Sequence, residues 1–329
     1  MAEVPRPLRV LVVKTTSMGD VVHTLPAVSD IARLHPGAQI DWLVEAPFAA
    51  IAALHPAVRQ VLPLSWRKWR KSLRDPATRA AIGQLRQRLQ AERYDWVIDF
   101  QGLVKSAMWA VQAHGTRAGY GWRSAREPLA SLLYHRHATV ARDLHAVERS
   151  RRLAAAVLGY PMPTTPPDFG LQAPAPAWSV PGMAPHAVLI PCASRPEKLW
   201  PEAHWRVLIE QMQARGWTPV VLWGSAEEEQ RAQRLAAGTQ AVLPPFLSVG
   251  DTAAVLAGAR VVVGLDTGFT HLAAALACPT VGIYCDHEPG LAGVTGSGWV
   301  RSLGGKGRVP SLYDVMAAFA QACEAAAAG

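Results

Sequence analysis

Short apolar segments alternate with helical patterns along nearly the whole chain, and this alternation restricts the fold more than any other feature. In the first half, strand-like runs lie at 8–13, 40–44, 58–64 and 96–100, and helix-like segments at 21–34, 48–54, 78–91, 103–114 and 144–158. In the second half, strands are expected at 186–191, 218–223, 260–265 and 280–284, with helices beginning at 201, 226, 249, 269 and 312. Such alternation predicts α/β architecture, with parallel sheets covered by helices on both faces.

The segment "APAPAWSVPGMAPHA", residues 173–187, is rich in proline and nearly free of charge, so it is predicted to be a linker. A chain of 329 residues also exceeds what one core usually holds. We therefore expect two Rossmann-like α/β/α domains, residues 1–172 and 188–310, facing each other across a cleft. A last helix at 311–329 is expected to pack back on the first domain, and residues 1–7 form a short leader.

Composition excludes several classes of protein. Half of the residues are hydrophobic and 18% are charged, which is typical of a globular chain. No apolar run reaches the roughly 18–20 residues of a membrane span, and no signal peptide is recognisable. The four cysteines have no metal-ligand spacing, so we expect no metal and a cytoplasmic protein. Neither half has a G-x-G-x-x-G or P-loop motif, which disfavours a dinucleotide oxidoreductase or a P-loop kinase.

The excess of positive over negative charge lies entirely in the first half of the chain. Residues 1–170 hold 23 Lys and Arg against 13 Asp and Glu, whereas residues 171–329 hold 10 against 12. This bias predicts an anionic partner for the first half, such as nucleic acid, an acidic ligand or an anionic membrane face.

The stretch "VVKTTSMGDVVHTLPA", residues 12–27, places Ser17, Gly19 and Asp20 between a strand and a helix. In an open α/β sheet this loop lies at the carboxyl end of the strand, where ligands bind. Asp20 is either a helix cap, a role that Asp, Ser and Thr fill well, or a functional carboxylate.

A second loop of this kind is "VVVGLDTGFTHLAAAL", residues 261–276. Asp266, Thr267 and Gly268 follow an apolar strand and open a helix whose free N–H groups and dipole favour an anion. His271 lies one turn further on. The alternative is a variant of the capping box with a hydrogen-bonded core histidine.

Two further loops of the second half contain charged residues. "PCASRPEKLWPEAHW", residues 191–205, offers Ser194 and Lys198, and a lysine here is either a phosphate ligand or a solvated surface group. "LWGSAEEEQRAQRL", residues 222–235, begins a helix with three glutamates. These acids are either placed here because the helix dipole favours negative charge at its N-terminus, or they include one that binds a ribose diol.

The first half contains two basic segments. In "SWRKWRKSLRD", residues 65–75, Arg67, Arg70 and Lys71 are interleaved with tryptophans, and "GYGWRSAREPLAS", residues 119–131, adds Arg126. Basic residues among aromatic ones suit nucleic acid or a lipid headgroup region. The alternative for the first segment is a solvated helix face with its indoles packed inward.

Taken together and in order, these motifs resemble bacterial ADP-heptose:lipopolysaccharide heptosyltransferases, glycosyltransferase family nine, and most closely its type I members. The resemblance runs over nearly the full chain. It rests on "LVVKTTSMGDVVHTLPA", "SWRKWRKS", "YDWVIDFQGLVKSA", "SAREPLAS", "HAVERSRRL", "EKLWPEAHWRVLI", "LWGSAEEEQRA" and "LDTGFTHLAAAL". It implies the GT-B fold and an inverting, metal-independent glycosyltransferase of lipopolysaccharide core synthesis that needs no cofactor.

The resemblance also implies roles for individual residues. Asp20 falls at the family's general base and Lys198 at its leaving-group lysine. The donor-binding positions fall on Ser194, Lys198, Glu228, Asp266, Thr267, Gly268 and His271. The acceptor-binding positions fall on Ser17, Gly19, Arg67, Arg70, Lys71 and Arg126. Ala193 departs from the pattern, since a hydroxyl residue is expected there.

The implied partners are ADP-heptose, Kdo2-lipid A and the cytoplasmic face of the inner membrane, approached by a monomer that binds no nucleic acid. The resemblance implies transfer of L-glycero-D-manno-heptose to a Kdo residue. Three alternatives remain open at this point: a type II enzyme that uses a heptosylated acceptor, a basic nucleic-acid-binding protein, and a nucleotide-sugar sensor without turnover.

Overall fold

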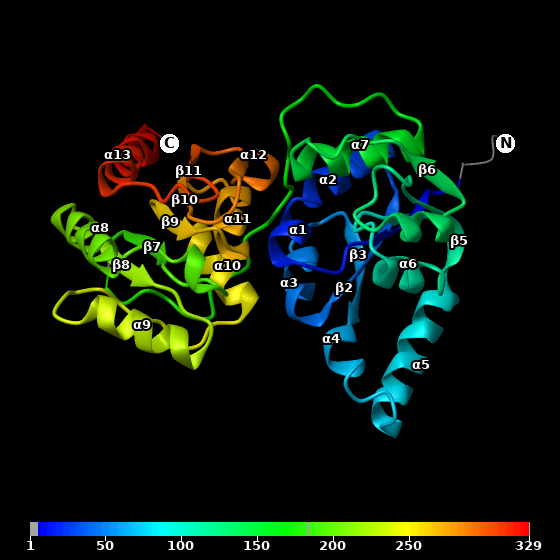
Figure 1. Cartoon of the computed structure of the whole chain (residues 1–329), viewed down its shortest axis with the longest axis horizontal. Helices are drawn as coiled ribbons and strands as arrows, with labels where there is room; N and C mark the ends of the chain where they lie inside the picture. Colours follow the sequence, from blue (N-terminus) through cyan, green and yellow to red (C-terminus); the bar gives the residue numbers. More distant parts are fainter. Residues whose placement is uncertain (1–5, 183, 329) are drawn as a thin grey trace. The chain divides into compact units, whose positions relative to one another are not determined.

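The computed structural model describes residues 6–182 and 184–328 of the chain (Figure 1). Most of the expected leader at residues 1–7, one residue of the expected linker and the last residue of the expected C-terminal helix lie outside the described residues. The chain divides into two compact units, Met1–Gly170 and Leu171–Gly329. The division falls within two residues of the expected end of the first domain, and the first strand of the second unit begins at His186, inside the segment expected to be a linker.

The first unit contains a parallel sheet with strand order β3-β2-β1-β4-β5-β6. Its strands are β1 (Arg9–Val13), β2 (Gln39–Glu45), β3 (Val58–Leu64), β4 (Arg93–Asp99), β5 (His114–Tyr120) and β6 (Arg136–Ala138). Its helices are α1 (Met18–Val22), α2 (Leu25–Leu34), η1 (Ala46–Phe48), α3 (Ala49–Ala53), α4 (Trp66–Trp69), α5 (Pro76–Ala91), α6 (Val104–Ala110), η2 (Pro128–Leu133) and α7 (Ala146–Leu158).

Helices cover both faces of this sheet. Leu11 and Val13 of β1 share an apolar cluster with Leu85 and Leu89 of α5. Because successive strand residues point to opposite faces, Val12 is buried on the other side. The helices α2 and α7 pack side by side (Figure 1).

Three details of the first unit differ from the sequence prediction. The helix expected at 21–34 is two helices, because Pro26 favours the first turn of a new one, α2. The helix expected at 103–114 ends at Ala110, and β5 begins at His114. Neither β5 nor the three-residue β6 was predicted, since "HGTRAGY" contains two glycines and only one β-branched residue.

The second unit contains a parallel sheet with strand order β11-β10-β9-β7-β8. Its strands are β7 (His186–Ile190), β8 (Thr218–Val221), β9 (Val262–Leu265), β10 (Thr280–Tyr284) and β11 (Val300–Gly304), the last of which was not predicted. Its helices are η3 (Pro196–Lys198), α8 (Glu202–Ala214), α9 (Ala226–Ala236), α10 (Val249–Ala257), α11 (Gly268–Ala275), α12 (Pro289–Ala292) and α13 (Leu312–Ala328).

The last helix, α13, belongs to the core of the second unit. Its apolar stripe of Val315, Ala318, Phe319 and Ala322 has helical spacing and is buried in the same cluster as Trp205 of α8. The stripe faces β10 and β11. The expectation that this helix packs back on the first domain is therefore wrong. No helix in the described part of the chain is both long enough and apolar enough to cross a membrane.

Gly119 of β5 offers a test of packing in the first unit. A Cβ at this position would lie under 3.0 Å from three ring atoms of Tyr134. We expect Gly119→Ala to lower the free energy of unfolding by about 1–3 kcal/mol, because the ring must shift in a packed core. Urea titration of the full chain measures this.

The matched control is Gly83→Ala in α5, where a Cβ would meet no described atom within 4 Å. Because alanine favours a helix interior over glycine by roughly 0.5–1 kcal/mol, this variant should be as stable as the unaltered chain or slightly more so. Equal stability of Gly119→Ala and the unaltered chain would show that the Tyr134 ring does not fill this space.

Candidate active site

Strand order reverses once in each sheet. In the first unit β1 lies between β2 and β4, and in the second unit β7 lies between β8 and β9. Loops at the carboxyl ends of the two strands beside such a reversal leave in opposite directions, and the opening between them is the usual ligand site of α/β sheets. Asp20 follows β1, Lys198 follows β7 and Asp266 follows β9, so three predicted site residues lie at these switch points.

In the first unit, the loop after β4 holds the loop after β1. Gln101 Oε1 accepts hydrogen bonds from the backbone N–H groups of Thr15 and Thr16, both at 3.0 Å. Gln101 is itself positioned by Asp99, which is fully buried and accepts its backbone N–H at 2.7 Å. Asp99 also accepts the Tyr134 hydroxyl at 2.7 Å. The polar loop after β1 is therefore held in place by hydrogen bonds to the loop after β4.

Asp20 is both a helix cap and an accessible carboxylate. Its Oδ2 accepts hydrogen bonds from the backbone N–H and the hydroxyl of Ser17, each at 2.8 Å. Its Oδ1 lies 3.6 Å from Lys14 Nζ, and its side chain is 32% exposed. Burial raises the pKa of Asp20, but the Lys14 charge, the Ser17 hydrogen bonds and His23 outweigh it and lower the pKa to about 2. The carboxylate is therefore ionised at neutral pH.

A small hollow of about 80 Å³ opens beside Asp20. Its lining includes Lys14, Gln101, Tyr120, Arg126 and Arg149. Lys14 donates to the Phe100 carbonyl at 3.1 Å, and the Arg149 guanidinium lies 4.8 Å from the centre of the Tyr120 ring. Three cations thus surround one carboxylate, an arrangement that suits a ligand with further negative charge.

Sequence reasoning did not assign Lys14, Gln101 or Arg149 to this site. All three lie inside motifs that carried the resemblance, "LVVKTTSMGDVVHTLPA", "YDWVIDFQGLVKSA" and "HAVERSRRL". Their convergence depends on strand order, which periodicity does not reveal.

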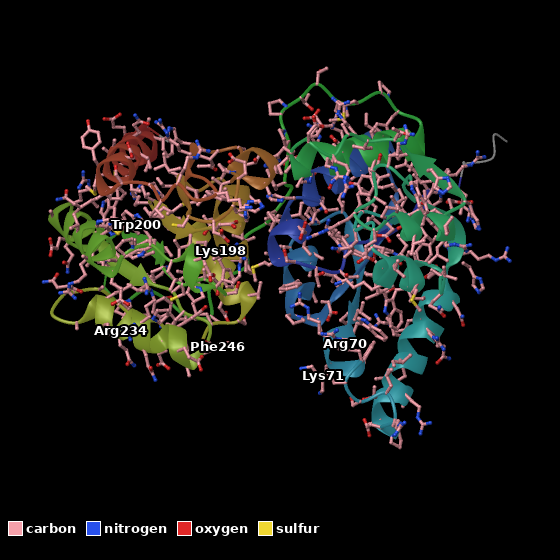
Figure 2. All side chains as sticks on the ribbon, in the orientation of Figure 1. Arg70, Lys71, Lys198, Trp200, Arg234 and Phe246 are labelled. Atoms are coloured by element: carbon pink, nitrogen blue, oxygen red, sulfur yellow. The ribbon has the colours of Figure 1, made fainter. Side chains whose placement is uncertain are left out.

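The basic segment around α4 presents its cations outward. Arg67, Arg70 and Lys71 are exposed, and Figure 2 shows Arg70 and Lys71 at the end of α4. Trp66 and Trp69 are half-buried against Trp109, with ring centroids 6.1 and 6.0 Å apart. The alternative of a solvated face with inward indoles therefore describes this segment. Of the other predicted acceptor positions, Arg126 and Ser17 are exposed and Gly19 lies in α1.

In the second unit, Lys198 and Asp266 form a close ion pair. Lys198 Nζ donates to Asp266 Oδ2 at 2.6 Å, and His271 Nε2 lies 3.6 Å from Oδ1 (Figure 2 labels Lys198). The two paired side chains are 17% and 14% exposed. Burial raises the pKa of Asp266, but His271 and Lys198 more than offset it and hold this pKa well below its usual range.

The start of α11 is open to an anion. In the described part of the chain, Thr267 begins α11 without a side-chain cap, and its hydroxyl lies 3.2 Å from that of Thr270. The first N–H groups of a helix have no partner within it, and the helix dipole adds positive potential there. The capping-box alternative for this loop is wrong, whereas His271 is buried as a core histidine would be.

The remaining predicted donor residues lie on neighbouring loops. Glu228 Oε2 accepts the Gly224 N–H at 2.8 Å, and Ser225 Oγ accepts the Glu228 N–H, so Glu228 is fixed at the start of α9. Ser194 is exposed on the loop after β7. Its neighbour Arg195 pairs with Asp286 after β10 at 2.8 Å, a contact that the sequence did not predict. Among the described residues, no group of three or more His, Cys, Asp or Glu is placed to hold a metal ion.

Comparison with known proteins identifies the family. The model of glycosyltransferase family 9 (heptosyltransferase) matches residues 82–303, which is more than half of the chain. This chain belongs to glycosyltransferase family 9. Lipopolysaccharide heptosyltransferase 1 of Pseudomonas aeruginosa is 49% identical over 292 residues, covering 88% of this chain and 82% of that protein. The protein of the same name from Escherichia coli K12 is 46% identical over 288 residues, covering 87% and 90%.

Solved structures agree with this assignment. The E. coli heptosyltransferase WaaC with ADP superposes with a TM-score of 0.88 at 42% identity, over 96% of this chain and all of that one. The predicted family, its type I branch and the GT-B fold class are confirmed. E. coli heptosyltransferase II, at 21% identity and a TM-score of 0.75, shares the fold.

The ion pair beside Asp20 predicts a shift in its titration. In Lys14→Met, removal of the ammonium should raise the pKa of Asp20 from about 2 toward its ordinary value of 3.8. Carboxyl ¹³C NMR during a pH titration measures this. The pKa of folded Asp20 lies below that of the unfolded chain. Ionised Asp20 therefore stabilises the fold above about pH 4, and this contribution is lost as pH falls through about 2.

Lys68→Met is the control, since Lys68 is an exposed lysine of the same unit on α4. It should leave the Asp20 titration in place. An unchanged pKa in Lys14→Met would mean that the Ser17 hydrogen bonds and His23 lower the pKa of Asp20 without Lys14.

Proposed function

We propose that this chain is a type I heptosyltransferase that moves L-glycero-D-manno-heptose from ADP-heptose to a Kdo residue of Kdo2-lipid A, in lipopolysaccharide inner-core synthesis. The observation that carries the proposal is the Lys198–Asp266 pair at the open start of α11, in a chain 49% identical to a lipopolysaccharide heptosyltransferase 1. A relative was solved with ADP and also with ADP-2-deoxy-2-fluoro heptose, which supports the choice of donor.

The second unit is the donor domain in this proposal. Lys198 and the first N–H groups of α11 stabilise the diphosphate as negative charge develops on it. Glu228, held at the start of α9, accepts hydrogen bonds from the ribose hydroxyls. Ser194, Thr267, Gly268 and His271 complete the site around the diphosphate and the sugar. Because the carboxylate of Asp266 is ionised and 2.6 Å from the Lys198 ammonium, it holds this side chain in place at the start of α11.

The first unit is the acceptor domain. Its excess of Lys and Arg matches the carboxylates and phosphates of Kdo2-lipid A. The exposed Arg67, Arg70 and Lys71 and the rim residue Arg126 supply the cations, while Ser17 and Gly19 border the carboxylate. The same geometry disfavours nucleic-acid binding, because Trp66 and Trp69 are half-buried against Trp109 and are not displayed as exposed stacking platforms for bases.

The reaction is an inverting displacement. A Kdo hydroxyl oxygen attacks the anomeric carbon of heptose, the bond from that carbon to the diphosphate oxygen breaks, and ADP leaves with the electron pair. Asp20 takes the hydroxyl proton. A carboxylate with a pKa of about 2 is a weak base but is always ionised at neutral pH. The proton is therefore transferred to Asp20 late in the reaction, after the new bond to the anomeric carbon has made the hydroxyl proton strongly acidic.

In this scheme Lys198 and the first N–H groups of α11 stabilise the negative charge of the leaving group. We therefore propose that turnover is metal-independent and requires no cofactor. The enzyme acts as a monomer at the cytoplasmic face of the inner membrane, where its lipid acceptor lies. Product analysis by mass spectrometry in EDTA, with ADP-heptose and either Kdo2-lipid A or a lipid already carrying one heptose, tests the proposal. One heptose added to Kdo2-lipid A supports it, and transfer only to the heptosylated lipid indicates a type II enzyme. Tight ADP binding without transfer to either indicates a sensor.

Asp20→Ala should lower turnover by at least about 10²-fold, because positioned proton transfer contributes roughly 10²–10⁴-fold. Affinity for ADP should stay within about twofold, since the donor binds to the other unit. Initial rates and calorimetric ADP titration measure both. Asp75→Ala is the control, because Asp75 caps α5 through Thr78 without touching the hollow. Lost ADP affinity with normal turnover would contradict the role of Asp20.

Lys198→Met keeps the aliphatic stem of the side chain and removes its charge. We expect turnover to fall by roughly 10²–10³-fold, as for removal of one donor to a developing anion, and ADP to bind more weakly. Rates at saturating ADP-heptose measure the first effect. The exposed Lys306 provides the matched control, Lys306→Met, which should behave as the unaltered enzyme does. Equal rates for the two variants would remove Lys198 from the mechanism.

A further inference from the structure

Three large apolar side chains on two packed elements of the first unit, α6 and η2, are exposed to solvent. Met108 of α6 is 57% exposed, and Leu129 and Leu132 of η2 are 59% and 70% exposed. We call these three residues the apolar patch. Residues three apart in a 3₁₀-helix share a face, so Leu129 and Leu132 project together. Large apolar side chains exposed together on neighbouring elements are a mark of an interaction site.

The patch is a consequence of how α6 and η2 pack. Their inward faces meet through Ala107 and Ala130, which share a buried cluster with Tyr134. Met108 and Leu129 are the chain neighbours of these two alanines, so they flank the seam between the two elements on its outer side. The small inward residues bring the elements close, whereas more than half of each large apolar side chain is exposed to solvent.

The patch adjoins the Asp20 hollow. Glu127, directly before η2, accepts the Val104 N–H at 2.7 Å and donates its own N–H to the Gly102 carbonyl. These contacts tie the beginning of η2 to the beginning of α6. Lys105, one turn before Met108 on the same helix face, donates to Thr16 Oγ1 at 3.2 Å in the loop that carries Asp20. Both elements therefore start at the reaction loop and extend outward from it.

Cations surround the end of the patch nearest the hollow. Burial and the neighbouring charges of Arg67 and Arg126 lower the pKa of Lys105, although Glu45 and Glu127 partly offset this. The three cations are thus close enough to interact electrostatically. Arg123 and Arg126 are exposed in the loop that leads into η2. Apolar side chains bordered by Lys and Arg match an anionic bilayer, in which the cations meet headgroups and the apolar groups enter the acyl boundary.

We propose that the apolar patch of Met108, Leu129 and Leu132 is the surface by which this chain docks on an anionic lipid bilayer. The choice of a bilayer rests in part on the proposed function, because the acceptor there is a lipid whose acyl chains stay in the membrane. Docking through the patch places the Asp20 loop next to the headgroup layer, where the sugar of the acceptor projects. The cations bring the chain to the surface, and the patch holds it there.

The test is sedimentation of the full chain with vesicles of phosphatidylcholine containing about 30% phosphatidylglycerol, without donor or acceptor. The variant is Leu129→Gln with Leu132→Gln, which removes apolar surface without changing charge. We expect its vesicle partition coefficient to fall at least about tenfold, because two apolar side chains no longer enter the acyl boundary. The matched control is Phe246→Gln with Tyr313→Gln, two side chains of the second unit that are 67% and 82% exposed. It should bind vesicles as the unaltered chain does.

Equal binding by both double variants and the unaltered chain would overturn the proposal and leave electrostatic attraction alone. A change in oligomeric state of the Leu129 and Leu132 variant, with normal vesicle binding, would overturn it in favour of a contact between copies of this chain. Turnover with a deacylated, water-soluble acceptor should be the same for that variant and the unaltered chain. If the unaltered chain transfers heptose neither to this acceptor nor to Kdo2-lipid A, the proposed function fails, whereas the vesicle result still decides the docking surface.

Discussion

The reversal of strand order beside β1 and beside β7 is the constraint on which the rest of this molecule depends. A parallel sheet needs a crossover between successive strands, and crossovers of opposite direction leave an opening at the carboxyl edge. Each unit fills this opening with short polar loops that are braced across the reversal. In the first unit Gln101 holds the loop after β1, and in the second Lys198 joins the loops after β7 and β9.

Both openings contain a carboxylate whose pKa is lowered in part by a nearby lysine. The charge of Lys14 lowers the pKa of Asp20, and that of Lys198 lowers the pKa of Asp266. In each case burial acts in the opposite direction and raises the pKa. The two pairs have different geometry and, in the proposed reaction, different roles. Lys14 is 3.6 Å from a carboxylate that remains one-third exposed and able to receive a proton. Lys198 is 2.6 Å from a carboxylate that is largely buried, so Asp266 serves to orient the lysine.

Local patterns in the sequence were sufficient to predict the α/β alternation, most of the central strands and the four strand-to-helix loops. They missed β5, β6 and β11, because neither the interior strand β5, "HGTRAGY", nor the edge strands β6 and β11 contain the apolar runs that mark buried parallel strands. They also misplaced α13, since an apolar stripe shows that a helix is buried but not which sheet buries it. Asp20 and Lys198 were identified from motifs, whereas Lys14, Gln101 and the Arg195–Asp286 pair depend on contacts between loops that only the folded strand order brings together.

The claim that each unit serves one substrate can be tested directly by methyl NMR of the full chain. ADP should cause its largest shifts at Leu265, Thr267 and Ile283, which lie at or next to the ends of β9 and β10. A water-soluble, deacylated acceptor should instead cause its largest methyl shifts at Val13 and Thr15, at and just after the end of β1. This separation is the result that the account predicts. If ADP gave its largest shifts at Val13 and Thr15, the assignment of donor and acceptor to the two switch points would be contradicted.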